Sequence, residues 1–128
     1  KVLEKLPPLL EAMKREGRRV AWMCDPMHGN TETAANGYKT RRFDNIRAEV
    51  EQSFDAHAAA GTRLAGVHLE LTGENVTECT GGARELVDAD LARDYRTTVD
   101  PRLNYEQSLE IAMLIVRKQG QIAAPASI

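Results

Sequence analysis

Residues 22–41, WMCDPMHGNTETAANGYKTR, begin as a short apolar run and then open into a polar loop that contains two glycines. The run over residues 20–24 has the length of a buried strand and follows a helix-like segment, which favours a parallel strand. An acid, a histidine and an asparagine come directly after it. We therefore expect a strand that delivers polar side chains to one edge of a sheet.

The segments on either side alternate between helical and extended patterns. A helix is predicted over about 7–16, because prolines suit a first helical turn and Gly17 follows. A second helix is predicted over 40–60, where apolar residues recur every three or four positions until Gly61. The strand predicted over 64–71 places Val67, Leu69 and Leu71 on one face and Gly66, His68 and Glu70 on the other.

The last third of the chain contains a weaker strand pattern around 96–99 and a final helix. Asn104 and Gln107 have the spacing of a capping box at the start of that helix. Its apolar stripe is predicted to consist of Leu109, Ala112, Met113 and Val116. Residues 121–128 lack a pattern, and we expect them to form a frayed tail.

This order of elements is typical of an α/β protein. Three strands make only part of a sheet, and an eight-stranded barrel is closed by its whole ring of strands. We therefore interpret residues 1–120 as about three βα units of a (β/α)8 TIM-type barrel. The chain begins with Lys1 instead of Met, so we expect it to be part of a longer protein whose targeting information is missing here.

Composition excludes several classes of function. The 128 residues carry a formal net charge of −2, which does not favour binding to nucleic acid or to an anionic membrane. No apolar run has the length of a membrane span. Two cysteines, Cys24 and Cys79, are too few for a disulfide scaffold and fit a reducing compartment.

Three side chains fall at the predicted carboxyl ends of strands, where α/β barrels carry their chemistry. His28, Glu70 and Asp100 together offer one imidazole and two carboxylates, a donor set that suits manganese, iron, cobalt or zinc. Each also has a structural interpretation, since a histidine after a strand or an aspartate before proline often belongs to a turn. Glu70 is harder to explain in that way, because a carboxylate in an apolar strand is costly unless it is paired or metal-bound.

Several blocks resemble the type II, plant-like 3-deoxy-D-arabino-heptulosonate 7-phosphate (DAHP) synthases. The blocks are CDPMHGNT (24–31), GYKTR (37–41), GVHLELTGENVTEC (66–79), GG (81–82) and DPRLN (100–104). The resemblance covers nearly the whole chain but only the C-terminal portion of that family. It implies a (β/α)8 barrel that condenses phosphoenolpyruvate with erythrose 4-phosphate, the first step of the shikimate pathway to aromatic compounds.

The resemblance also implies a metal site. His28, Glu70 and Asp100 match three of the family's four ligands of a divalent ion, with Mn²⁺ expected first and Co²⁺, Fe²⁺ or Zn²⁺ as alternatives. The fourth ligand is a cysteine from the N-terminal part of the family, which neither Cys24 nor Cys79 matches. Cys24 could approach a metal by proximity, but we expect it to be a buried structural thiol.

Further residues are expected to bind substrate or to orient the site. Lys39 matches a lysine placed near the aldose phosphate, so the expected catalytic residues are His28, Lys39 and Glu70. Arg41 and Arg102 can likewise bind phosphate, although each of the three cations can also be a solvated surface charge. Three further residues, Asn30, Glu74 and Asn75, are expected to orient ligands or water, and Asn30 is also expected to bind substrate. The structural alternative is that their side chains cap turns. His68 is left unassigned, and His57 is expected to be exposed on its helix.

The resemblance implies an aldol-like reaction. The metal would polarise the aldehyde oxygen, the enol carbon of phosphoenolpyruvate would attack, and water would add before phosphate leaves. Most residues that hold phosphoenolpyruvate in the family lie upstream of Lys1, so we expect the isolated chain to be inactive. We expect a cytoplasmic homo-oligomer, or a plastid one in a plant. The alternatives are a non-catalytic, self-associating module and a metal-dependent aldolase of another barrel family.

Overall fold

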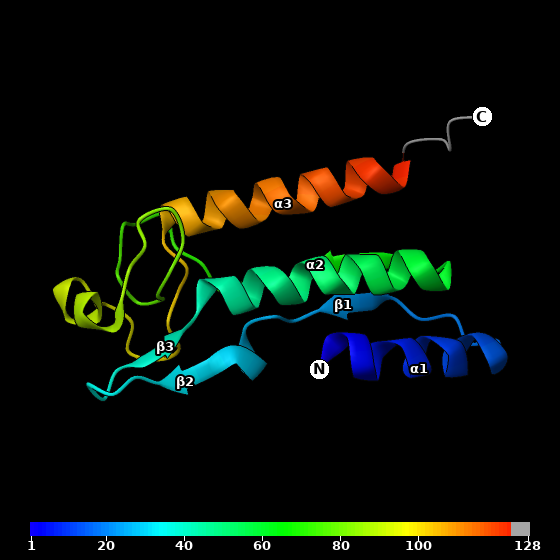
Figure 1. The fold of residues 1–128 in the computed structure, drawn as a ribbon, viewed down its shortest axis with the longest axis horizontal. Coiled ribbons are helices and arrows are strands. Elements are labelled where there is room, and N and C mark those ends of the chain that lie inside the picture. The colour runs from blue at the N-terminus through cyan, green and yellow to red at the C-terminus, as the bar shows by residue number, and fades with distance from the viewer. Residues whose placement is uncertain (124–128) are drawn as a thin grey trace.

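The computed structural model describes residues 1–123, in which three α-helices lie along a small parallel sheet (Figure 1). The helices α1 and α3 lie on opposite sides of α2. Two short 3-10 helices, η1 and η2, lie in the loops. In chain order the elements are α1 (Val2–Arg15), β1 (Trp22–Cys24), η1 (His28–Asn30), β2 (Thr31–Thr33), β3 (Lys39–Arg41), α2 (Phe43–Ala60), β4 (Leu64–Val67), η2 (Asp88–Arg93) and α3 (Tyr105–Ala123).

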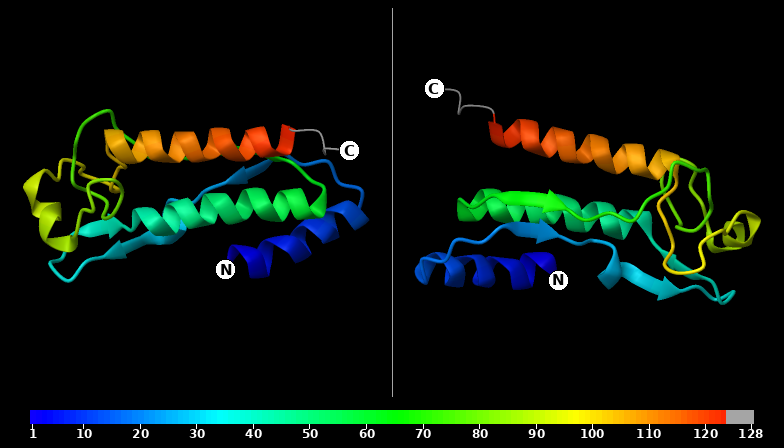
Figure 2. Two further views of the ribbon diagram at one scale, coloured as in Figure 1. Left: turned by 45° about the horizontal axis from the view of Figure 1, so that its top comes forward. Right: turned by 180° about the vertical axis from the view of Figure 1, so that it is seen from behind.

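The central feature is a parallel pair of strands joined through α2. Strand β1 pairs with β4, with Cys24 opposite Val67, and Figure 2 shows the two strands running in the same direction beside α2. The His68 N–H donates to the Cys24 carbonyl at 2.8 Å, so the contact continues past the end of β4. Further along, Leu71 forms a parallel bridge with Leu103. The predicted α/β class is confirmed at the level of a partial α/β domain.

The helix α2 carries the core. Its buried apolar stripe consists of Phe43, Ile46, Val50 and Phe54, and each such side chain contributes about 1.5–3 kcal/mol when it leaves water. The helix predicted over 40–60 is therefore confirmed, although its first residues belong to β3, which pairs antiparallel with β2. Gly61 ends α2 in the left-handed region at φ 64°, a conformation that glycine adopts without steric cost.

The start of α3 follows the predicted capping box. The Asn104 side chain accepts from the Gln107 N–H at 2.9 Å, and the Gln107 side chain accepts from the Asn104 N–H at 3.1 Å. The predicted apolar stripe is wrong, because Leu109, Met113 and Val116 are about half exposed or more. The buried stripe passes instead through Gln107, Ile111 and Leu114. Gln107 turns inward because its amide donates to the carbonyls of Cys79 and Gly81, and this sets the rotation of the helix.

Both terminal helices are longer than the sequence pattern indicates. Helix α1 begins at Val2 and includes both prolines, because Glu4 and Lys5 already donate to the Lys1 carbonyl and form the first turn. Helix α3 continues to Ala123. The remaining part of the expected tail, 124–128, lies outside the described residues.

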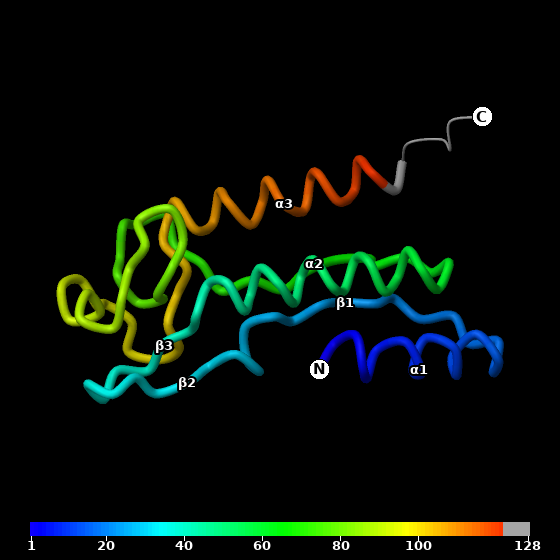
Figure 3. Tube along the Cα trace, viewed as in Figure 1, coloured from blue at the N-terminus to red at the C-terminus, as the bar shows by residue number. Residues whose placement is uncertain are grey.

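The connection from residue 68 to residue 104 is mostly irregular, and Figure 3 shows it folded at one end of the molecule. The strand predicted over 64–71 ends at Val67. The strand predicted around 96–99 does not form, because the Thr97 N–H donates to the Glu78 carboxylate and the Thr97 hydroxyl to the Asp100 carbonyl. Leu103, which follows that segment, forms the parallel bridge with Leu71.

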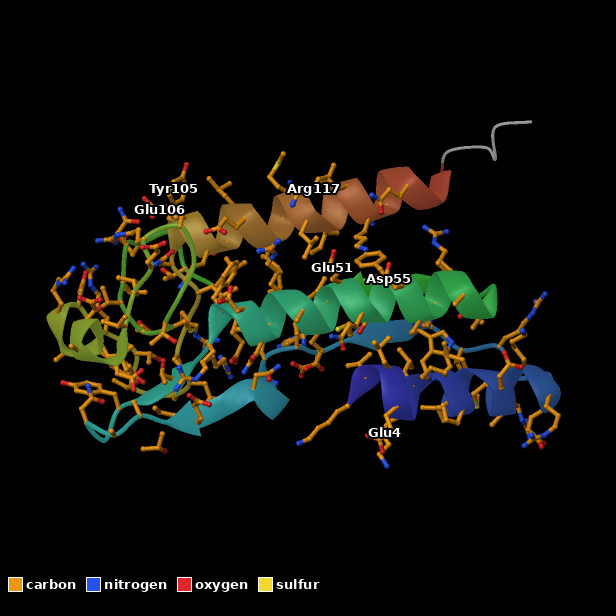
Figure 4. The ribbon with its side chains drawn as sticks, viewed as in Figure 1. Glu4, Glu51, Asp55, Tyr105, Glu106 and Arg117 are labelled. Carbon is orange, nitrogen blue, oxygen red and sulfur yellow. The ribbon has the colours of Figure 1, made fainter. Side chains whose placement is uncertain are left out.

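Two acidic residues and one lysine connect the outer turns of α2 and α3. Lys118 lies 2.8 Å from the Asp55 carboxylate and 3.4 Å from that of Glu51, and Figure 4 shows both acids on the side of α2 that faces α3. Tyr105 projects away from α2.

Within residues 1–123, no helix combines the length and the apolar character that crossing a bilayer requires.

Candidate metal centre at the strand ends

Three potential ligands converge beyond the ends of β1 and β4. His28 opens η1 after β1, Glu70 follows β4, and Asp100 lies in the loop before the Leu103 bridge. One donor atom from each side chain lies within 4.8 Å of the others, and His28 Nε2 is 3.9 Å from Glu70 Oε1. Side chains that lie far apart in the sequence thus form a single cluster of one imidazole and two carboxylates.

His28 is held by Asp25, which comes directly after β1. Asp25 Oδ1 accepts the backbone N–H groups of Met27 and His28 at 3.0 and 3.2 Å. Its other oxygen, Oδ2, lies 2.7 Å from His28 Nδ1. Partial burial raises the pKa of Asp25, but these hydrogen bonds and the charge of the nearby imidazole outweigh burial and place the pKa below its usual value. Asp25 is therefore ionised at neutral pH.

Glu70 lies between two arginines. Arg41 Nη2 is 2.7 Å from Glu70 Oε2, and Arg102 Nη1 is 2.8 Å from Glu70 Oε1. Burial raises the pKa of Glu70, whereas the contacts and charges of Arg41 and then Arg102 lower it, with a net shift below the usual value. Glu70 is thus kept anionic in a site where only 13% of its side chain is exposed.

Arg41 is fully buried and organises the loop that carries Asp100. Its guanidinium donates to the Pro101 carbonyl at 2.5 Å and to the Thr31 hydroxyl at 2.9 Å, and Nη2 lies 3.9 Å from Asp100 Oδ2. Lys39 contacts the other oxygen of Asp100. The contact with Lys39 is the main reason why the pKa of Asp100 is lowered.

The loop around Asp100 also depends on Glu78, which the sequence analysis did not select. Glu78 is 2% exposed, and its two oxygens accept the N–H groups of Thr97 and Arg102 at 3.2 and 3.1 Å. A buried carboxyl group whose two oxygens both accept backbone N–H groups has its hydrogen-bonding needs met. A signal was present in the sequence, because Glu78 interrupts a run of small and apolar residues in VTEC.

The residues predicted to support the site divide into two groups. Lys39, Arg41 and Arg102 all contact its carboxylates. Asn30 turns away from the cluster, since its amide donates to the Pro26 carbonyl and to Glu49. Glu74 pairs with Arg96 at the surface, and Asn75 is exposed.

The remaining histidines and cysteines lie around the core. His57 is 1% exposed, so the expectation of an exposed histidine is wrong. Its ring packs edge-on against Trp22 and lies within hydrogen-bonding distance of Thr62. Cys24 and Cys79 are free and buried, and burial had been expected for Cys24 alone. Burial raises the pKa of both thiols, that of Cys79 to about 12.

A separate hollow lies between α1, β1 and α2. Its volume is about 330 Å³, and Leu6, Leu9, Trp22 and Leu64 form much of its wall. Glu70 and Asp100 do not line it. The hollow thus has a largely apolar wall, but it reaches the strand ends at Asp25, which contacts His28.

The cluster has donors that fit a divalent ion. Glu70 Oε2 is buried and contacts Arg41 Nη2 at 2.7 Å, and Oε1 contacts Arg102 at 2.8 Å, so each oxygen has one cationic neighbour. A carboxylate oxygen in that condition retains a lone pair for a cation. A mixed nitrogen and oxygen donor set suits first-row transition metals. The fold and this site define a class of protein, a partial α/β domain with a histidine–carboxylate cluster beyond the ends of its parallel strands.

Sequence comparison identifies the family within that class. Residues 1–116 match the Class-II DAHP synthetase family, and the chain belongs to that family. The resemblance found in the sequence blocks is thereby confirmed.

Two curated relatives are similar over 115 residues, which is 90% of this chain. The "Phospho-2-dehydro-3-deoxyheptonate aldolase AroG" of Mycolicibacterium smegmatis is 55% identical, and the match covers 25% of that protein. The "Phospho-2-dehydro-3-deoxyheptonate aldolase" of Streptomyces coelicolor is 51% identical, with 26% covered. The chain thus spans about a quarter of the length of these relatives. Both are bacterial, so they give no support to a plastid location.

Proposed function

We propose that this chain is the C-terminal part of a 3-deoxy-7-phosphoheptulonate synthase that condenses phosphoenolpyruvate with erythrose 4-phosphate and releases phosphate. The observation that carries the proposal is the convergence of His28, Glu70 and Asp100 within 4.8 Å. Family membership and the names of the two relatives support it. The product would enter the shikimate pathway to aromatic amino acids.

His28, Glu70 and Asp100 would hold the divalent ion, with Mn²⁺ proposed first and Co²⁺, Fe²⁺ or Zn²⁺ as alternatives. When bound, the ion supplies a Lewis acid that polarises the aldehyde oxygen of erythrose 4-phosphate. Arg41 and Arg102 keep Glu70 ionised, because the anion is stabilised by two adjacent positive charges. The protein thus keeps Glu70 in the anionic form that a cation requires.

The three cations have different access to a substrate. The Lys39 side chain is about half exposed and that of Arg102 is 30% exposed, so both can turn from a carboxylate to a phosphate oxygen. We propose that Lys39 binds the phosphate group of erythrose 4-phosphate. Arg41 has no exposed side-chain surface, which favours a role in holding Glu70 and the Asp100 loop over direct phosphate binding. Asn30 would orient η1, because its amide is already engaged on the side away from the cluster.

The parent fold would be a (β/α)8 barrel, of which residues 1–120 supply the last βα units. Support comes from the parallel pairing of β1 with β4, from α2 as the connection between them, and from the parallel bridge between Leu71 and Leu103. Consecutive parallel strands joined by helices are the building units of such barrels. We propose that the complete synthase is a cytoplasmic homo-oligomer.

The first test is phosphate release from both substrates with Mn²⁺, measured on the full-length protein that contains this chain. His28→Ala and Glu70→Ala should each reduce turnover by at least about 100-fold, as expected when a metal ligand or its orientation is lost. Asp94→Ala is the matched control, because Asp94 pairs with Arg96 at the surface. Turnover that survives both ligand substitutions would refute the proposed centre.

A second measurement concerns the isolated 128 residues. We expect them to show no phosphate release, because the family's fourth ligand and most of its phosphoenolpyruvate-binding residues lie in its N-terminal part. Activity of the isolated chain at the level of the full-length protein would contradict this expectation.

The second candidate function is a non-catalytic module that associates with copies of itself. The exposed apolar side chains of α3, Leu109, Met113 and Val116, favour it, since exposed apolar patches often mark association surfaces. Sedimentation of the isolated chain distinguishes the two candidates. Stable oligomers with no Mn²⁺ binding would favour the module, whereas Mn²⁺ binding that His28→Ala removes favours the synthase.

A further inference from the structure

We propose that Asp25 is a positioning residue that fixes which ring nitrogen of His28 faces the proposed metal site. The inference rests on the proposed function, because it concerns the delivery of His28 to a metal ion. From the sequence alone, Asp25 is an aspartate before proline, a pattern that commonly opens a turn. In the structure its two carboxylate oxygens make three contacts, two at Oδ1 and one at Oδ2.

The two oxygens of Asp25 have separate partners. Oδ1 accepts the backbone N–H groups of Met27 and His28 and so shapes the turn. Oδ2 reaches His28 Nδ1 at 2.7 Å. The first set of contacts places the backbone of His28, while the second acts on its ring. An aspartate needed only for the turn would not require the second contact.

The contact with Oδ2 determines where the imidazole proton lies. A carboxylate only accepts hydrogen bonds, and Asp25 already acts as an acceptor, because its Oδ1 accepts two backbone N–H groups. In the neutral ring, Nδ1 therefore carries the hydrogen and Nε2 keeps its lone pair. Nε2 is the nitrogen that faces Glu70, at 3.9 Å from Oε1. A hydrogen bond from the distal nitrogen to a carboxylate is a common way of orienting a metal-binding histidine.

A competing arrangement uses the same histidine. Asp25, His28 and His68 also place potential ligand atoms within 4.8 Å of one another, and the rings of His28 and His68 are 5.7 Å apart. In that arrangement Asp25 would itself be a metal ligand. All three residues are exposed, whereas Glu70 and Asp100 are partly enclosed and contact arginine and lysine. The enclosed group is the better defined site, so we favour the positioning role.

Two substitutions at the same position separate the ring contact from the turn. Asp25→Asn keeps an acceptor for the turn but presents an amide donor to His28 Nδ1, which moves the ring hydrogen to Nε2 and blocks coordination. Asp25→Ser keeps a hydroxyl acceptor for the turn and leaves the ring without a partner. If Asp25 served the turn alone, Asn would be the milder change. The positioning role predicts the opposite order.

The experiment measures the Mn²⁺ dissociation constant of the full-length protein by competition with a fluorescent chelator. We expect Asp25→Ser to weaken binding about 10-fold and Asp25→Asn about 100-fold, the range known for partners of metal ligands. Pulsed electron paramagnetic resonance of bound Mn²⁺ should also show that coupling to a coordinated imidazole nitrogen is lost in Asp25→Asn. Retained coupling together with an Asn variant no weaker than the Ser variant would overturn the proposal.

Two further variants identify the cause of any failure. His68→Gln should leave Mn²⁺ binding unchanged, and a loss as large as that of Asp25→Asn would assign the metal to the competing arrangement and overturn the positioning role. His28→Ala should abolish tight binding. If the wild-type protein binds Mn²⁺ no better than His28→Ala does, the proposed metal centre fails. If only the order of the Asp25 variants fails, the centre stands without the positioning role.

Discussion

Arg41 is the most enclosed charge of the candidate site, and its contacts explain why a guanidinium is needed there. It contacts Glu70, the Pro101 carbonyl and the Thr31 hydroxyl from one planar group. A lysine offers a single ammonium and cannot reach these acceptors in the same fixed directions. We therefore expect this position to tolerate neither lysine nor an apolar residue.

Arg41→Met should lower the free energy of unfolding by about 3 kcal/mol, because it leaves the partly buried carboxylate of Glu70 without its nearest partner. Urea denaturation of the full-length protein measures the change. Arg42→Met is the matched control, since Arg42 pairs with Glu32 at the surface, and it should cost less than about 1 kcal/mol. Equal losses in the two variants would contradict the role given to Arg41.

His57 should make stability depend on pH. Burial lowers its folded-state pKa below the reference value of 6.5, so protons bind preferentially to the unfolded chain. The contribution of neutral His57 to the free energy of unfolding is therefore complete above about pH 6.5 and is lost as the pH falls through the folded-state pKa. Thermal unfolding between pH 5 and 8 should show a weaker decline in His57→Gln than in wild type. The exposed-site control His68→Gln should keep the wild-type slope, and an unchanged slope in His57→Gln would reject this explanation.

At the level of single residues, the sequence predicted the positions of potential ligands better than the contacts around them. The sequence places His28, Glu70 and Asp100 at or near the carboxyl ends of predicted strands, and the structure brings them together. The contacts of Asn30 and Glu78 were missed, because each depends on a partner far along the chain, Glu49 for the first and Thr97 for the second. The roles of these residues in binding and catalysis remain predictions.

Among the elements, the loop over residues 97–102 shows how a segment without regular structure is kept in place. Glu78 accepts one N–H group near each end of it, and Arg41 binds the Pro101 carbonyl between them. These contacts replace the ladder of hydrogen bonds that a strand would have formed. Asp100 is therefore positioned by side chains from two other segments.

Glu78→Gln should loosen this loop, because an amide can accept only at its oxygen and leaves one N–H group unsatisfied. The cost should be about 1–3 kcal/mol. Hydrogen exchange should speed up at the Thr97 and Arg102 amides while the amides in the middle of α2 keep their rates. Glu74→Gln is the control, since Glu74 is exposed and pairs with Arg96 at 3.4 Å at the surface. Faster exchange throughout α2 would instead indicate general destabilisation.

Local signals predicted the helices best. The apolar stripe of α2, its glycine end and the capping box of α3 depend on neighbours within a few residues, and all three were confirmed. The prediction of which face of α3 is buried was wrong, because that face depends on the hydrogen bonds of Gln107 to carbonyl groups far along the chain. The hairpin of β2 and β3 was missed, since its strands are only three residues each. No pattern of period two can be recognised over such a length.

On the scale of the whole molecule, the candidate ligands come from three separate segments, so a bound ion would tie these segments together. Mn²⁺ at a hundred times its dissociation constant should raise the free energy of unfolding by about 2.7 kcal/mol. Thermal unfolding of the full-length protein with Mn²⁺, and then with excess chelator, measures the effect. Asp100→Ala should reduce the increase, whereas Asp94→Ala should preserve it. An equal increase in all variants would indicate that Mn²⁺ binds elsewhere.

The parallel pairing of β1 with β4 has a consequence for the order of folding. The hairpin and all of α2 lie between these strands in the chain, so the strands meet only after a long loop has closed, and such contacts form slowly. The helical turns of α2 need only local contacts and can form earlier. We therefore expect helical signal to return early during refolding and affinity for a divalent ion to return last, which makes ion binding a reporter of the final step of assembly.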